Sequence, residues 1–119
     1  MQKIIKIILL ITFIFSVSLG KAIADKKIRI GLLVPLTGKY SQIGQSIIKS
    51  TQLAINKINN PSIEIIPKDT KSDPRITLAA AKELSRLDIR IVIGPVFNEN
   101  LIYLDELSEL TFLLDNSRS

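Results

Sequence analysis

Four short apolar runs, separated by segments of helix length, constrain the fold of this 119-residue chain more than any other feature of its sequence. The runs lie at residues 27–34, 63–67, 89–93 and 111–114. The first becomes continuously apolar before it stops at Pro35, a pattern typical of a central strand buried on both faces. Strands joined through helices pair in parallel by right-handed crossovers. The sequence therefore predicts an α/β fold: a three-layer parallel sheet in the order βαβαβαβ.

Two of the intervening segments carry clear helix signals. Residues 42–59 form a one-sided amphipathic pattern, with Ser41 as the expected N-cap and Asn59-Asn60-Pro61 as the stop. Asp73 followed by Pro74 predicts the N-cap and the first residue of a second helix. The side chains expected on the buried face of that second helix are Leu78, Ala81, Leu84 and Leu87.

The last intervening segment also predicts a helix, capped by Asn98 and beginning at Glu99. Its expected buried stripe consists of Leu101, Leu104, Leu107 and Leu110. In the second apolar run, Glu64 would point to one face, which places that strand nearer an edge of the sheet.

The first 24 residues have the three parts of a secretory signal peptide. Lys3 and Lys6 give a basic start, an apolar run follows, and Ala22-Ile23-Ala24 matches the small-x-small pattern of a cleavage site. The apolar run has about 13 residues, fewer than the ~20 that a membrane-spanning helix needs. We expect cleavage after Ala24, which leaves residues 25–119 as one periplasmic domain without a stable membrane anchor. A lipid anchor would require a cysteine, and the chain has none.

The net charge of +5 belongs mostly to this leader. Three of the 16 basic residues lie in it and all 11 acidic residues lie outside it, so residues 25–119 hold 13 basic and 11 acidic side chains and a net charge of +2. A balance this close to neutral gives no electrostatic reason to expect nucleic acid as a partner. Without cysteine or histidine, the chain also lacks the usual ligands of a structural zinc site.

Four loops are candidates for a binding site, because ligands of open parallel sheets bind beyond the carboxyl ends of the strands, where the strand order switches. These loops are residues 35–41, 69–73, 95–98 and 116–119. The first and third follow the two most apolar strands, so we expect them to face each other across the switch point.

Polar groups suited to a small anionic ligand lie in the first and third loops. Helix starts at Ser41 and Asn98 would present backbone N–H groups to a carboxylate, although both residues could equally be simple caps. Phe97, directly after a strand, could form one wall of a pocket or pack locally.

The sequence gives little support for a catalytic function. The absence of histidine and cysteine removes the common nucleophilic triads, and no glycine-rich phosphate loop follows the first strand. Asp69 and Asp73 resemble the acidic pocket of a response-regulator receiver, but such a pocket also needs acids after the first strand, where Pro35-Leu36-Thr37 stands. We expect a protein that is not an enzyme and needs no cofactor.

Three segments carry a resemblance to a known family. Residues 28–44, IRIGLLVPLTGKYSQIG, are similar to the opening of type I periplasmic binding proteins of the branched-chain amino acid (Leu/Ile/Val) family. Residues 69–84, with their acids, alanine-rich helix and Lys-Glu-Leu, and residues 91–96, IVIGPV, look like that family too, in the right order. Together the segments are more specific than any one alone.

The resemblance implies a two-lobed protein that closes on a solute and delivers it to an ABC permease. In that family the loops after the first and third strands supply much of the first lobe's ligand contact. Carried over by position, the ligand-binding residues are Thr37, Tyr40, Ser41, Ile43, Val96, Phe97 and Asn98. The amino acid binders tend to have small or hydroxyl residues where this chain has Phe97-Asn98-Glu99, so the solute stays open between amino acids and amides.

A second resemblance is to the penicillin-binding protein activator, whose domain opens with a LLxPLxGxYxxxGQ-like run that residues 32–45 match. Those activators are typically lipoproteins, and this chain has no cysteine. The alternative interpretation is thus a cell-envelope regulatory domain that binds a protein.

The length of the chain bears on ligand affinity. The family is much longer and has a second lobe, so the resemblance implies an incomplete N-terminal lobe, a fragment or truncated product with half of the cleft. Pockets normally bury 70–90% of a small ligand. We therefore expect this chain alone to bind its solute weakly.

Overall fold

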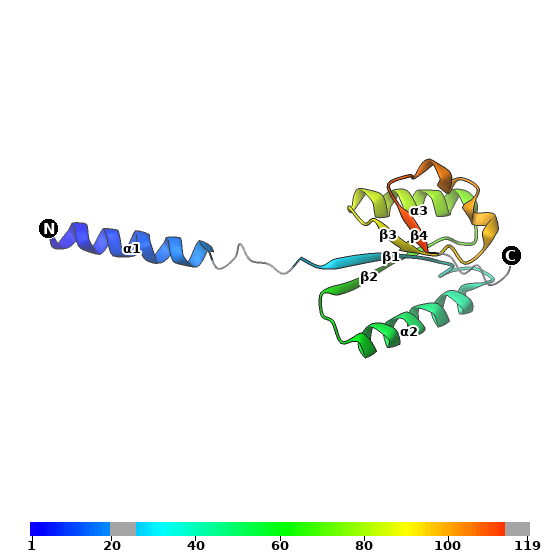
Figure 1. The fold of residues 1–119 in the computed structure, drawn as a ribbon, viewed down its shortest axis with the longest axis horizontal. Coiled ribbons are helices and arrows are strands. Elements are labelled where there is room, and N and C mark those ends of the chain that lie inside the picture. The colour runs from blue at the N-terminus through cyan, green and yellow to red at the C-terminus, as the bar shows by residue number, and fades with distance from the viewer. Residues whose placement is uncertain (20–25, 114–119) are drawn as a thin grey trace.

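The computed structural model describes residues 1–19 and 26–113, and its core is a four-stranded parallel sheet (Figure 1). The strands are β1 (Ile28–Val34), β2 (Ile63–Asp69), β3 (Ile91–Ile93) and β4 (Thr111–Leu113). Their order across the sheet is β2-β1-β3-β4, with β1 paired in parallel to both of its neighbours. The strand that contains Glu64 is an edge strand, as its polar residue predicted.

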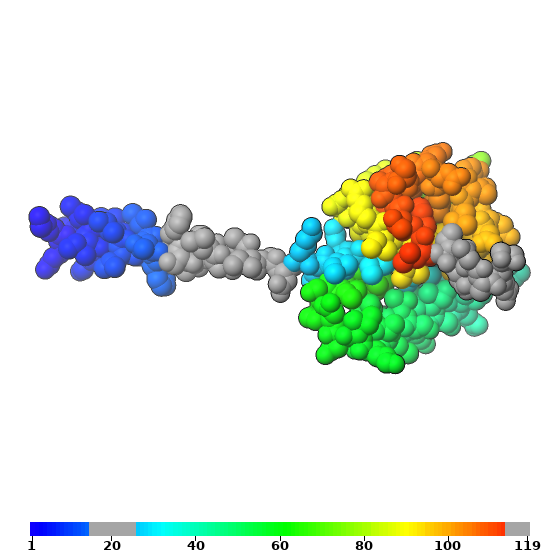
Figure 2. All heavy atoms as spheres, in the orientation of Figure 1, coloured from blue at the N-terminus to red at the C-terminus, as the bar shows by residue number. Residues whose placement is uncertain are grey.

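Helices cover both faces of this sheet. Helix α2 (Ser41–Ile58) lies on one face, whereas α3 (Pro74–Arg86) and the 3-10 helices η1 (Asn98–Leu101) and η2 (Leu104–Glu106) lie on the other (Figure 1). The predicted three-layer α/β fold with a parallel sheet is therefore confirmed. Figure 2 shows the same separation, with α2 in green below the sheet and the η1–η2 segment in orange above it.

The best-packed part of the core lies between the sheet and α3. Leu33, Ala81, Leu84 and Val92 have no exposed surface, and Leu104, Leu107 and Leu110 close the cluster from the η1–η2 side. Burial of each leucine or valine side chain contributes about 1.5–3 kcal/mol, so this layer contributes substantially to the stability of the fold.

Local sequence signals set the helix ends largely as predicted. Asp73 caps α3 through its Oδ1 atom, which accepts from the N–H groups of Arg75 at 2.8 Å and Ile76 at 3.0 Å. Asn59 ends α2 in the left-handed conformation, with φ 53°, and its N–H donates to the carbonyl of Ile55.

The predicted third α-helix after Asn98 is wrong, because η1 and η2 replace it. The buried stripe nevertheless holds for Leu104, Leu107 and Leu110, and Leu101 is partly buried. These leucines recur every third residue, which matches the three residues per turn of a 3-10 helix better than the 3.6 of an α-helix.

The buried face of α3 agrees only in part with the prediction. Ala81 and Leu84 are buried as predicted and Leu78 is partly buried, but Leu87 is 43% exposed, and Thr77 and Ala80 are buried in addition. Leu53 is 69% exposed on α2, where Gly44 is the buried residue. Gly44 lies against the backbone of Pro35 in the loop after β1, and Ala81 is fully buried in the core, so both helices make close contacts at residues that need little space.

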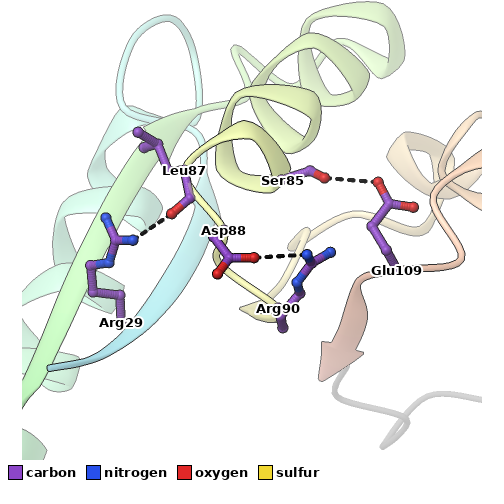
Figure 3. Close-up of polar contacts among 6 residues, drawn as sticks. All are labelled: Arg29, Ser85, Leu87, Asp88, Arg90 and Glu109. Atoms are coloured by element: carbon purple, nitrogen blue, oxygen red, sulfur yellow. Dashed lines mark hydrogen bonds and ion pairs between the residues drawn. The ribbon is translucent and has the colours of Figure 1, made fainter. Parts of the chain in front are cut away.

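Polar contacts connect β1, the end of α3 and the segments before β3 and β4 at the amino edge of the sheet, opposite the candidate loops (Figure 3). Arg29 in β1 donates to the carbonyl of Leu87, which follows α3. Asp88 and Arg90 form an exposed ion pair at 2.7 Å, and Ser85 donates to Glu109 at 2.8 Å. These contacts join β1 to the residue after α3, and the last turn of α3 to the segment before β4.

Helix α1 (Gln2–Leu19) covers most of the predicted leader and stands apart from the sheet (Figure 1). The side chains of the isoleucines and leucines from Ile4 to Ile14 are exposed. Across residues 1–19 and 26–113, no helix combines the length and the apolar character needed to cross a membrane.

Candidate ligand-binding site

The loops after β1 and β3 lie beside each other at the carboxyl edge of the sheet. β1 and β3 are adjacent and parallel, although β2 comes between them in the sequence, so the strand order switches at this pair. Thr37 and Asn98 therefore lie at the same edge, as the sequence predicted. The fourth predicted loop, 116–119, lies outside the described residues.

An aromatic contact bridges the two loops. The rings of Tyr40 and Phe97 have their centroids 4.9 Å apart and are tilted by 56°, a geometry that is favourable for an aromatic pair. Tyr40 is 37% exposed, Phe97 is half-buried, and the Lys39 ammonium lies 5.2 Å from the centroid of the Tyr40 ring. Phe97 packs against the opposite loop and so forms part of the surface between β1 and β3.

Asp69, the last residue of β2, holds the loop after β1 in place. Its Oδ1 atom accepts from the Leu36 N–H at 2.8 Å and from the Lys71 N–H at 2.9 Å. Its Oδ2 atom accepts from the Thr37 hydroxyl at 2.6 Å. The hydroxyl proton of Thr37 is thus committed to Asp69, which leaves the exposed Thr37 oxygen as an acceptor toward a ligand.

The same contacts lower the pKa of Asp69 below its ordinary value of 3.8. Desolvation by burial acts to raise the pKa, but the hydrogen bonds from Thr37, Leu36 and Lys71 to the charged form outweigh it. The carboxylate is therefore ionised at neutral pH and supplies negative charge beside Thr37.

The start of α2 offers fewer free donors than the sequence predicted. The predicted N-cap Ser41 is instead the first residue of the helix, and Tyr40 occupies the N-cap position without a side-chain capping bond. The Ser41 N–H donates to Gly38 at 3.2 Å, and those of Ile43 and Gly44 donate to Tyr40 at 3.0 and 3.3 Å. Ile43 itself contributes an exposed apolar side chain.

The start of η1 also differs from the prediction. Asn98 is the first residue of η1 rather than its cap, the cap position is Phe97, and no side chain makes a capping bond. The amide of Asn98 is exposed. Asn98 and Val96 line a cavity of about 250 Å³ together with Ile47, Ile93 and Leu113.

Two glycines let these loops approach the sheet. A Cβ atom on Gly44 would lie 1.8 Å from the Pro35 carbonyl oxygen, so only glycine allows α2 to begin this close to the loop after β1. Gly94 has φ 101°, and a Cβ there would lie 2.5 Å from the Leu33 carbonyl oxygen. Both contacts are to backbone atoms, which leaves little scope for adjustment.

The structure thus brings Thr37, Tyr40, Val96, Phe97 and Asn98 to one edge, with Ser41 and Ile43 on the first turn of α2 behind them. The sequence pointed to Asp69 only as an acid at the end of a strand. Its position two residues after an apolar run, level with Val34 at the end of the neighbouring strand, was the signal for its supporting role.

A parallel α/β sheet with converging loops at its switch point defines the class of open-sheet α/β proteins. A family model described as periplasmic binding protein matches residues 27–101. The match covers more than half of the chain, so the chain belongs to the periplasmic binding protein family, whose members are extracytoplasmic. This result confirms the resemblance seen in the sequence.

Individual proteins agree with this assignment. The chain is 30% identical over 80 residues to the Leu/Ile/Val-binding protein BraC3 of Rhizobium johnstonii, a match that spans 62% of this chain and 22% of the relative. It is similar in fold to a solute-binding protein of an ABC transporter from Rhodopseudomonas palustris, solved with 3,4-dihydroxybenzoic acid, with TM-score 0.69, 23% identity, and coverage of 76% of this chain and 27% of that one.

A third similar structure is LpoA from Haemophilus influenzae, with TM-score 0.63 and 22% identity over 77% of this chain and 17% of that one. The chain spans less than a third of the length of each of these three proteins.

Proposed function

We propose that this chain is the first-lobe part of a periplasmic substrate-binding component of an ABC transporter for amino acids or amides, and not an enzyme. The observation that carries the proposal is the convergence of the loops after β1 and β3 through the Tyr40–Phe97 contact, in a member of the periplasmic binding protein family. The ligand-binding residues in this proposal are Thr37, Tyr40, Ser41, Ile43, Val96, Phe97 and Asn98.

The chemistry of these loops supports a ligand with both donors and acceptors. Thr37 presents an acceptor oxygen beside the ionised Asp69, which favours an ammonium or amide N–H. The Asn98 amide can donate to a carboxylate or carbonyl oxygen. Tyr40 and Phe97 supply an apolar surface between them. The Leu/Ile/Val-binding protein is consistent with an amino acid, and the dihydroxybenzoic acid complex with an aromatic acid as a competing solute.

We propose that solute affinity is low in this chain alone, because the described loops form one wall of a cleft and leave the other side of a ligand in water. Pockets normally bury 70–90% of a small ligand. Isothermal titration of the full chain with leucine, isoleucine, valine, small amides and 3,4-dihydroxybenzoate tests this. We expect no binding tighter than millimolar, and sub-micromolar affinity for any of them would refute the half-site argument.

Export is part of the proposal. Residues 1–24 act as a signal peptide in this reading, and the remainder works in the periplasm with the permease of an ABC transporter as its partner. Mass spectrometry of the protein recovered from the periplasm is expected to show Asp25 as the first residue. Recovery of the intact chain in the membrane fraction would contradict the cleavage site.

A second candidate function follows from the fold of LpoA and the LLVPLTGKY…GQ run. In this alternative the domain is a cell-envelope regulator of the penicillin-binding protein activator kind and binds a protein. The isothermal titration with small solutes discriminates between the two functions. Saturable binding of a solute that Phe97→Ala weakens would favour the transport function.

A further inference from the structure

Lys39 lies at the tip of the loop after β1, in a position that the backbone fixes. The Ser41 N–H donates to the carbonyl of Gly38 at 3.2 Å, which closes a four-residue turn with Lys39 and Tyr40 at its centre. The φ and ψ angles of Tyr40, −102° and 15°, are close to those of the third residue of a type I turn. Gly38 begins the turn with φ 83°, a conformation that favours glycine. The exposed side chains of Lys39 and Tyr40 therefore start from a defined place on the loop.

The ammonium group of Lys39 is held beside the aromatic contact that joins the two candidate loops. It lies 5.2 Å from the centroid of the Tyr40 ring, within the roughly 6 Å over which a cation and an aromatic face attract each other. The same ring contacts Phe97 in the loop after β3, with the two centroids 4.9 Å apart. These contacts keep the positive charge of Lys39 on the surface between β1 and β3.

Lys39 is the only charged residue in the two converging loops, residues 35–41 and 94–98. Among the described residues, no carboxylate lies within ion-pair distance of its ammonium group. Asp69, the acid that supports the loop after β1, uses both carboxylate oxygens to accept hydrogen bonds from Thr37 and from two backbone N–H groups. Within the described part of the chain, therefore, no ion pair neutralises the charge of Lys39.

The position of Lys39 does not serve the stability of the helix that follows. Lys39 stands two residues before Ser41, the first residue of α2, where the positive end of the helix dipole lies. A positive side chain is unfavourable at this end of a helix, and the first turn of α2 contains no acidic residue to offset it. A lysine that opposes the local helix dipole and has no ion-pair partner in the described chain is explained by an anion from outside the chain.

We propose that Lys39 is a specificity-determining residue of the candidate site, where its ammonium group binds the carboxylate of the solute beside the Tyr40–Phe97 contact. The proposal rests on the proposed function and narrows it, because amino acids carry a carboxylate and neutral amides do not. A carboxylate accepts hydrogen bonds from the three donors of a lysine ammonium group and also gains the attraction between opposite charges. A neutral amide gains only the hydrogen bonds. Lys39 therefore selects acids over the corresponding amides.

The expected preference is modest, because Lys39 is exposed and its charge is screened by water. An exposed ion pair corresponds to a preference of about two- to fivefold in Kd for an acid over its amide. The preference should decrease when the salt concentration is raised, since salt screens exposed charges. An apolar contact with the Tyr40 and Phe97 rings would not show this dependence on salt.

Two pairs of solutes, matched in shape and different in charge, test the proposal. The 15N-labelled full chain is titrated with benzoate and benzamide, and with leucine and leucinamide. The backbone amide signals of residues 36–41 and 96–98 are followed by NMR, which detects millimolar affinities. We expect each acid to bind about two- to fivefold more tightly than its amide. Lys39→Gln should abolish this preference, and Lys39→Arg should retain it because arginine keeps the charge.

Lys49→Gln is the matched control, because it makes the same change in net charge at an exposed position of α2 outside the candidate loops. It should leave both preferences unchanged. If it abolishes them as Lys39→Gln does, the effect belongs to the net charge of the chain and the proposal is overturned.

The same titrations separate the role of Lys39 from the proposed function. If the loop signals respond equally to acids and amides, and Lys39→Gln changes neither response, solute binding stands and the role of Lys39 is refuted. If none of the four compounds moves the loop signals of the parent chain, the proposed solute site fails, and the role of Lys39 fails with it.

Discussion

The Thr37 hydroxyl donates a 2.6 Å hydrogen bond to Oδ2 of Asp69, and this contact joins the loop after β1 to the end of β2. Replacement of Asp69 by Ala removes this bond and the two from the N–H groups of Leu36 and Lys71. Hydrogen bonds to a charged group each contribute about 1.5–3 kcal/mol, and part of the loss is recovered by water. We expect the free energy of unfolding to fall by about 2 kcal/mol, measured by urea denaturation. The exposed Asp105→Ala serves as control and should stay within about 0.5 kcal/mol of the parent chain.

The lowered pKa of Asp69 gives stability a defined dependence on pH. Because its pKa in the folded chain lies below the ordinary value of 3.8, the unfolded chain binds more protons in acid. The stabilisation is fully present above about pH 5 and is lost as the pH falls through the folded pKa. Urea denaturation between pH 7 and pH 2.5 should show a smaller loss for Asp69→Asn than for the parent chain. Equal losses would contradict the assignment of this charge to the loop.

The close approach of Gly44 to Pro35 predicts a sharp response to one added methyl group. Gly44→Ala would place a Cβ 1.8 Å from the Pro35 carbonyl oxygen, so the first turn of α2 must move away from the loop. Overpacking of this kind costs about 1–3 kcal/mol, which thermal unfolding would show as a lower Tm. Ser46→Ala, exposed half a turn away on the same helix, is the matched control and should leave the Tm nearly unchanged.

The aromatic contact between Tyr40 and Phe97 couples the two candidate loops energetically. A double-mutant cycle with Tyr40→Ala and Phe97→Ala should give a coupling free energy of about 0.5–1.5 kcal/mol in denaturation experiments. The pairing of Tyr103→Ala with Phe97→Ala provides the comparison. If the effects of Tyr40→Ala and Phe97→Ala on the free energy of unfolding add up to that of the double mutant within error, the two loops are not energetically coupled.

Much of this fold is predictable because its local signals agree with the tertiary structure. The apolar runs, the Asp73-Pro74 start and the Asn59-Asn60-Pro61 stop each specify one element without reference to the rest of the chain. The adjacency of β1 and β3 follows from their apolar character and from the crossover rule. That adjacency was enough to bring Thr37 and Asn98 to one edge of the sheet.

The remaining differences arise where contacts distant in sequence decide the structure. The leucines after Phe97 could also form the buried stripe of an α-helix, and their three-residue spacing, which fits 3-10 turns, is seen to matter only once they pack with Leu84 in the core. Ser41 has the right chemistry for a cap, yet the contact of Gly44 with Pro35 starts the helix one residue earlier. The role of Asp69 depends on hydrogen bonds to a loop 33 residues away in sequence.

The arrangement β2-β1-β3-β4 has a consequence for how this chain acquires its structure. β1 stands at the centre of the sheet but is made first, and its second neighbour is complete only when Ile93 has been synthesised. Until then one side of β1 keeps its backbone N–H and C=O groups unpaired, and Leu33 and Val92 cannot meet in the core. Cooperative folding must therefore wait until most of the chain has been synthesised, so a chain stopped before Ile93 would leave its most buried strand without one of its two neighbours.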